Sequence, residues 1–183
     1  MQIDPYGFEK VSFKLEEAEF FLNHVRGAGE DVLPFYVSAF LAAARSVRDS
    51  LKRLCDQLPE AIDWFRNEDK KLHDSEAHDR FRSLRNISLH EGENPVNAWS
   101  VELYVDNGSV ETITRCHLCS REGHRNAEGN VGAYDDCREH FGVLLRLSLA
   151  ARGQFGTKLD PHGITGEAFE GLRTRNGTDA TRH

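Results

Sequence analysis

Two side chains that together suit phosphodiester chemistry lie five positions apart, at Arg85 and His90. An arginine stays charged at neutral pH and matches phosphate oxygens, and a histidine can accept or release a proton near neutrality. On a bound RNA strand, the histidine would act as base or acid on a ribose 2′-hydroxyl, and the arginine would stabilise the charge of the transition state. Asn86 adds a polar group that can hold the phosphate. Together these residues have the chemistry to cleave a phosphodiester without a metal ion.

A structural explanation of the same pair is also open. Residues five apart are separated by about 140° on an ideal helix, so Arg85 and His90 converge only if the last turn distorts or two copies of the helix meet. The helix dipole alone also favours cations near a helix C-terminus. The spacing by itself therefore leaves a catalytic pair and a structural pair as alternatives.

A second group of chemically active residues begins at Cys116 and Cys119 and continues with Cys137 and His140. A Cys-x-x-Cys followed by a Cys-x-x-His has the ligand types of a structural zinc site. Cys137, however, is in helical step with Phe141, so a buried core thiol is the alternative, and the one we favour. The sequence has no catalytic zinc motif such as His-Glu-x-x-His. We therefore expect no cofactor in the reaction.

The elements that must position these residues are mostly helices. The second expected helix has the clearest apolar stripe, with residues at three- and four-residue steps. That stripe comprises Val37, Phe40, Leu41, Ala44, Val47, Leu51, Leu54 and Leu58. Caps, breakers and periodicity predict five helices. The first runs from about Ser12 to Arg26, the second starts near Asp31, and the third runs from Pro59 to about Arg66. The fourth includes Phe81 and Leu84 and ends at Gly92, and the fifth runs from about Gly132 to Arg152. In the polar stretch 67–79 we expect His73 and His78 to be solvated.

One stretch between the helices has a different period. Trp99, Val101 and Leu103 alternate with polar residues, and Asn107-Gly108 separates them from a second β-rich run. This pattern predicts a β-hairpin over about 96–118. The predicted fold is therefore mainly α, an antiparallel helical bundle with an inserted β-hairpin, over residues 1–155. For residues 156–183 we expect a C-terminal tail, either poorly ordered or a strap over the bundle.

Composition narrows the possible classes of protein. The 183 residues include 39% hydrophobic ones, enough for a core, and no apolar run approaches the ~18 residues of a membrane span. The N-terminal stretch lacks a basic start followed by an apolar run, so we expect no signal peptide and a cytoplasmic location. Four cysteines in a reducing cytosol would be thiols or metal ligands. The net charge of −7 argues against broad polyanion binding, but it leaves room for a local basic site.

The residues around the first pair resemble the signature of the HEPN superfamily. That signature is an arginine, a polar residue, a few further residues and a histidine at the end of a helix, as in Arg85-Asn86-x-x-x-His90 after Arg80-Phe81-Arg82-Ser83-Leu84. The resemblance extends to the stretches 35–46 and 134–140 and covers about residues 12–152, with the hairpin as an insertion. One common subgroup has a tyrosine two residues after the histidine, which a partner nucleotidyltransferase modifies. Gly92 stands there in this sequence, which puts that kind of neutralising partner in doubt.

The resemblance implies a helical bundle that dimerises, so that two Arg–His motifs form one composite site. Many HEPN proteins are metal-independent ribonucleases, often toxins of toxin–antitoxin or antiphage systems. Carried over to this chain, Arg85 and His90 would be catalytic and Asn86 supporting. The expected partners are a second copy, an RNA substrate, and an antitoxin or defence protein. The alternative is a non-catalytic HEPN-like module that binds RNA or another protein.

Further basic residues lie near the motif along the chain. Arg80 and Arg82 are candidate RNA-binding residues because they precede the motif on the same helix. A second set on the preceding long helix, Arg45, Arg48, Lys52 and Arg53, would either extend an RNA groove or form an ordinary solvated helix face. The solvated face is the simpler expectation.

Overall fold

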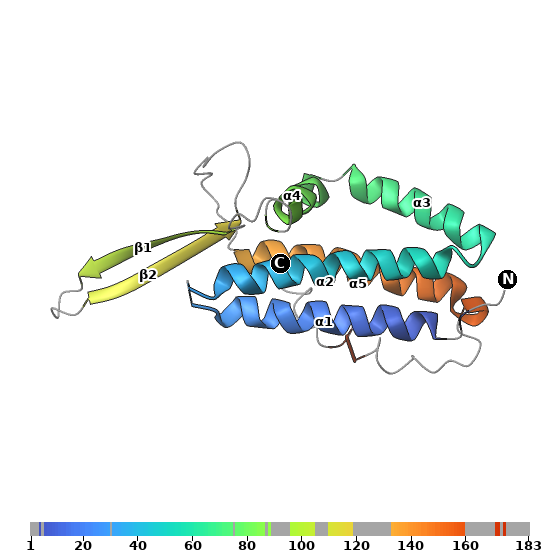
Figure 1. Ribbon diagram of the computed structural model, residues 1–183, viewed down its shortest axis with the longest axis horizontal. Coiled ribbons are helices and arrows are strands. Elements are labelled where there is room, and N and C mark those ends of the chain that lie inside the picture. Colours follow the sequence, from blue (N-terminus) through green and yellow to red (C-terminus); the bar gives the residue numbers. More distant parts are fainter. Residues whose placement is uncertain are drawn as a thin grey trace.

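The computed structural model describes residues 4, 6–29, 31–74, 76–86, 88, 96–104, 110–118, 133–159, 171–172 and 174 (Figure 1). The described chain is mainly helical, which confirms the predicted class. Its helices are α1 (Gly7–Gly27), α2 (Leu33–Cys55), α3 (Pro59–His73), α4 (Glu76–Asn86) and α5 (Ala133–Leu159). Two strands, β1 (Val96–Tyr104) and β2 (Val110–Leu118), lie between α4 and α5 in the chain.

Three long helices form the body of the molecule. Helices α1, α2 and α5 contact one another, and α1 runs in the opposite direction to the other two (Figure 1). Helices α3 and α4 pack on α2 and α5, on the side away from α1 (Figure 1). Within the described ranges, no helix is long and apolar enough to cross a membrane. This arrangement places α4, the helix with Arg85, on the outside of an α2–α5 framework.

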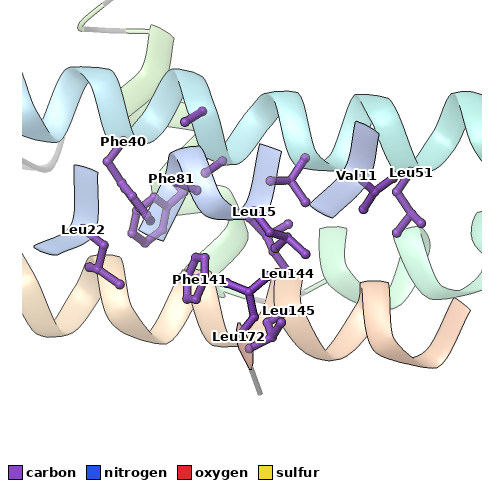
Figure 2. Close-up of a cluster of buried hydrophobic side chains, with 14 of the residues drawn as sticks. Val11, Leu15, Leu22, Phe40, Leu51, Phe81, Phe141, Leu144, Leu145 and Leu172 are labelled. Atoms are coloured by element: carbon purple, nitrogen blue, oxygen red, sulfur yellow. The ribbon is translucent and has the colours of Figure 1, made fainter. Parts of the chain in front are cut away.

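The hydrophobic core follows the apolar stripe predicted for α2. Seven of the eight stripe residues are buried, and Leu58 is partly buried just beyond the helix end. Phe40 and Leu51 have no exposed surface. In the core, Phe40 lies at the same end as Phe141 of α5, and Leu51 lies beside Val11 of α1 (Figure 2). Because residues three and four apart share one face of a helix, this stripe is what gathers the other helices around α2.

Three helix boundaries differ from the prediction. Helix α1 begins at Gly7 instead of Ser12, because Phe8 extends the buried stripe by a turn and Ser12 is itself buried. Helix α3 continues past Arg66 to His73, where Leu72 still packs inward. The third difference is at the C-terminal end of α5.

Helix α5 extends past Arg152 to Leu159, so the domain boundary predicted at residue 155 falls inside a helix. Phe155 and Leu159 continue its buried face, and this burial outweighs the poor helix propensity of Gly153 and Gly156. Further along, Leu172 is fully buried and lies beside Leu145 of α5 (Figure 2). Besides Leu172, the described residues of the predicted tail are 156–159, 171 and 174.

Strands β1 and β2 pair antiparallel, from Val96 opposite Leu118 to Tyr104 opposite Val110. Both lie in the stretch where the sequence predicts a hairpin. Strand β1 contacts α2 and strand β2 contacts α5, and the strands then extend away from one end of the bundle (Figure 1). The Asn107-Gly108 turn lies outside the described residues.

The outer face of α1 carries a row of exposed aromatic side chains. Tyr6, just before the helix, and Phe13 and Phe20 recur every seven residues and are 53%, 61% and 55% exposed. Seven residues are close to two helical turns, so the three rings lie along one line. Helix α1, which carries this row, lies on the side of the α2–α5 pair opposite α4 (Figure 1).

Candidate functional site

A small cavity lies where α4 crosses α2 and α5. Its volume is about 40 Å³, room for about three water molecules. All three helices contribute to its wall. The lining residues are Leu41, Ala44, Arg45 and Arg48 from α2, His78, Phe81, Arg82 and Arg85 from α4, and His140 and Leu144 from α5. Four of these described residues are arginines and none is acidic.

The inner part of the cavity is apolar and aromatic. Phe81 stacks on His140, with ring centroids 4.1 Å apart and planes 9° apart. Phe81 also meets Phe40 edge to face in the core, and Leu144 is buried beside them. This packing fixes α4 against α2 and α5, and it sets the positions from which the α4 arginines reach the cavity.

Arg48 is the most firmly held of the cavity arginines. Its Nε and Nη2 donate to the two carboxylate oxygens of Asp69, each at 2.6 Å, and its Nη2 also lies 3.1 Å from Nε2 of His73. The arginine and aspartate side chains are 11% and 17% exposed. The Nη1 nitrogen makes no hydrogen bond to a described residue, since its nearest carboxylate oxygen, on Asp49, is 3.8 Å away. Asp69 and His73 thus orient the guanidinium, and its Nη1 has only a long ion pair with Asp49 and no hydrogen bond to a described residue.

The other arginines differ in how far their charge is compensated. Arg45 donates through Nε to Asp49, at 3.0 Å, and its side chain is 37% exposed. Arg85 is half-buried, and it forms no hydrogen bond or ion pair with any residue that the structure describes. Arg82 is exposed at the same cavity. Unmatched guanidinium donors that are partly withdrawn from water favour a bound anion.

Three neighbouring histidine rings lead from α3 to the cavity wall. They belong to His73 of α3, His78 of α4 and His140 of α5. The His73 and His78 ring centroids are 4.6 Å apart, and those of His78 and His140 are 6.1 Å apart. Burial lowers the pKa of His78 to about 4, with further lowering from the neighbouring His73 and Arg48. Burial also lowers the pKa of His140, to about 3, with a smaller effect from His78. Both rings are neutral at pH 7. The prediction that His78 is solvated is wrong, because Phe81 and His140 draw its helix face inward.

The structure describes two of the three predicted motif residues, Arg85 and Asn86. Arg85 lines the cavity, and Asn86 is half-buried beside it at the end of α4 without lining the cavity. The Ser88 hydroxyl donates to Oγ of Ser38 on α2, at 2.7 Å. This bond ties the segment that follows Arg85 to the framework. His90 lies outside the described residues.

The flanking basic residues do not all behave as the sequence predicts. Arg80 lies in α4, but its side chain is outside what the structure describes. The expectation of a solvated face holds for Lys52 and Arg53, which are exposed, and is wrong for Arg45 and Arg48.

The proposed zinc set is described only in part. Cys137 is fully buried in the core, as its step with Phe141 predicts, and burial raises the pKa of its thiol. His140, one turn later, stacks on Phe81. The Cys116 side chain and Cys119 lie outside the described part of the chain. Within that part, no group of three or more potential ligands could hold a metal ion.

The sequence interpretation favoured a solvated position for Arg48 over a place in an RNA groove, and it named His140 only as a possible zinc ligand. Arg48 follows the buried Val47 and lies one turn from Ala44, so it is at the margin of the apolar stripe. The sequence signal for Arg48 was its position at the edge of the apolar stripe, together with Asp69 in the next helix as a possible ion-pair partner. The signal for His140 was its place one residue before the buried Phe141.

Comparisons of this chain with protein-family models, with curated proteins and with solved structures find no match. The chemistry of the cavity is therefore inferred from its own residues.

Proposed function

We propose that this protein is a metal-independent endoribonuclease of the HEPN type, acting as a toxin or in defence. The observation that carries the proposal is Arg85: a half-buried arginine without an ion pair among the described residues, in a cavity whose described lining includes three further arginines and no acidic residue. Such an arrangement suits a phosphodiester, whose oxygens are good partners for guanidinium groups. The resemblance of the Arg85–His90 segment to the HEPN signature supports the same conclusion.

In this proposal the ribose 2′-oxygen attacks the adjacent phosphorus and the 5′-oxygen of the next nucleotide leaves. His90 removes the proton from the 2′-hydroxyl or delivers one to the leaving oxygen. Arg85 stabilises the extra negative charge on the phosphorus-bound oxygens, and Asn86 supports the same group. The products are a 2′,3′-cyclic phosphate and a 5′-hydroxyl. The second histidine that such a reaction needs comes from a second copy of the chain, so the active form is a homodimer.

The test is cleavage of RNA by the purified protein in EDTA, compared with the His90→Ala and Arg85→Gln variants. We expect the parent protein to leave 2′,3′-cyclic phosphate ends and both variants to lose at least about a hundredfold in rate. His24→Ala is the matched control, because His24 lies on α1, away from the cavity. Unchanged circular dichroism would establish that the variants are folded. Cleavage that survives in His90→Ala would contradict the proposed role of that residue.

A non-catalytic interaction module is the second candidate, and the exposed aromatic row on α1 favours it. An exposed aromatic surface is typical of a protein-binding face. If no RNA class is cut by the parent protein, and Phe13→Ala abolishes capture of a protein partner, this second candidate replaces the first.

A further inference from the structure

We infer that the cavity binds a single phosphate group through Arg45, Arg48 and Arg85 and leaves the attached bases outside. The inference rests on the proposed function and adds how the strand is recognised: by its backbone, without regard to base. It also assigns a binding role to two α2 residues that lie outside the Arg–His motif.

The first support is the number of donors left over when the internal pairs are formed. Asp69 occupies the Nε–Nη2 edge of Arg48, and Nη1 forms only a long ion pair with Asp49, at 3.8 Å. Asp49 accepts from Nε of Arg45 only, and Arg85 has no partner among the described residues. Three guanidinium groups thus face two carboxylates, and their remaining donors line one cavity. A charge-assisted bond to an oxyanion satisfies such donors better than a neutral partner does.

The second support is the size and shape of the space. The space for water-sized groups is narrow, about 40 Å³, or about three water molecules. A phosphodiester with its two unesterified oxygens is compact, whereas a nucleobase is larger. The stacked Phe81 and His140 rings form the wall behind the arginines. We therefore expect the phosphate to enter and the base edges to stay outside.

The third support is that the site is preorganised. Arg48 is held by Asp69 and His73, and the segment after Arg85 is held by the bond between Ser88 and Ser38. Groups that are already oriented lose less entropy when they bind a ligand. The exposed Lys52, by contrast, is paired with Asp56 one turn along the outer face of α2, so it does not belong to this site.

The experiment begins with inorganic phosphate as the probe. We expect a saturable ¹H–¹⁵N NMR titration with shifts in α2 and α4, and at least about tenfold weaker binding by Arg45→Gln. Arg53→Gln is the matched control, since it removes the same charge from an exposed position of the same helix. Absence of saturation, or equal loss in the two variants, would show diffuse charge attraction and overturn the inference.

The second arm uses short RNA strands of uridine, adenosine or cytidine only. We expect their affinities to agree within about threefold, with a similar loss in Arg45→Gln for each and a smaller salt dependence. The affinities of strands with and without a 5′-phosphate are then compared. This comparison shows whether the bound group is a terminal phosphate or an internal one. A tenfold preference for one base would overturn the inference.

Failure of this inference is distinguishable from failure of the proposed function. Phosphate binding that depends on Arg45, in a protein that cuts no RNA, would sustain the inference and reject the ribonuclease. RNA cleavage that needs His90, with binding unaffected by Arg45→Gln, would reject the inference and sustain the ribonuclease.

Discussion

Asp69 determines the orientation of Arg48, since its two carboxylate oxygens accept from Nε and Nη2 on one edge of the guanidinium. Asp69→Asn removes the compensating charge but keeps the shape. We expect the free energy of unfolding in urea to fall by about 1–3 kcal/mol, because a largely buried arginine then lacks its counter-charge. Asp63→Asn breaks an ion pair with Arg66 whose side chains are 73% and 70% exposed, and it should cost less than about 0.5 kcal/mol. Equal effects would mean that the Arg48 pair is not more stabilising than a surface pair.

The histidines of the cavity predict a dependence of stability on acid. The pKa values of His78 and His140 are about 4 and about 3 in the folded protein, below the value of about 6.5 in an unfolded chain. Between about pH 6.5 and pH 4 the unfolded chain therefore binds protons that the folded protein does not. Stability is fully present above pH 6.5 and decreases as the pH falls, by up to about 2 kcal/mol for each histidine between pH 7 and pH 5.

Urea unfolding at pH 7, 6 and 5 measures this dependence. His140→Gln removes one of the two groups, so its stability should fall less steeply with acid than that of the parent protein. His24→Ala, a change on α1, should leave the slope unaltered. Parallel curves for the parent and His140→Gln would indicate that His140 is not kept neutral by the fold.

At the scale of single residues, local pattern predicted Arg85, Asn86 and the core thiol Cys137, since each depends on its own helix. It did not predict the role of Arg48. That role depends on Asp69, which is 21 residues away in sequence and comes next to it only because α3 packs on α2. The polar stretch 67–79 has the same composition whether Asp69 is solvated or buried, so composition could not predict the Arg48–Asp69 contact.

Among the elements, α2 is the one whose burial organises the others. Phe40→Ala should lower the free energy of unfolding by about 3–5 kcal/mol, because the side chain is fully buried and leaves a cavity between α1, α4 and α5. Phe35→Ala makes the same chemical change in the same helix at a position 72% exposed, and should cost less than about 0.5 kcal/mol. Thermal or urea unfolding of both variants compares them directly.

Helix interiors were predictable because their apolar period is long and regular, whereas helix ends were not. Ser12 has the residue type of an N-cap, yet Phe8 and Val11 add buried surface before it, and burial of two large side chains exceeds the value of a cap. Burial also outweighed the local helix-end signals in α3, which continues through a polar sequence, and in α5, which continues through two glycines. Tertiary burial set the boundaries in each case, and it is not visible in a local window.

On the scale of the whole molecule, the C-terminal segment contributes to the core from outside the helical bundle. Leu172 is fully buried, so Leu172→Ala should cost about 2–4 kcal/mol of unfolding free energy in urea. Thr174→Ala, at an exposed position two residues later, is the control and should change little. Equal stability of the two variants would mean that the segment packs too loosely to support the core.

Helix α5 has 27 residues, a length of about 40 Å, and it contacts each of the other four helices and β2. Its central amides can therefore exchange with solvent only when the whole protein unfolds, and their exchange rates report the global stability. The 11-residue helix α4 lies outside this framework. We expect its amides to exchange faster than those of α5, and a phosphate bound between α2 and α4 to slow exchange in α4 while leaving the centre of α5 unchanged. Such a difference would make one wall of the arginine cavity the least stable helix of the bundle.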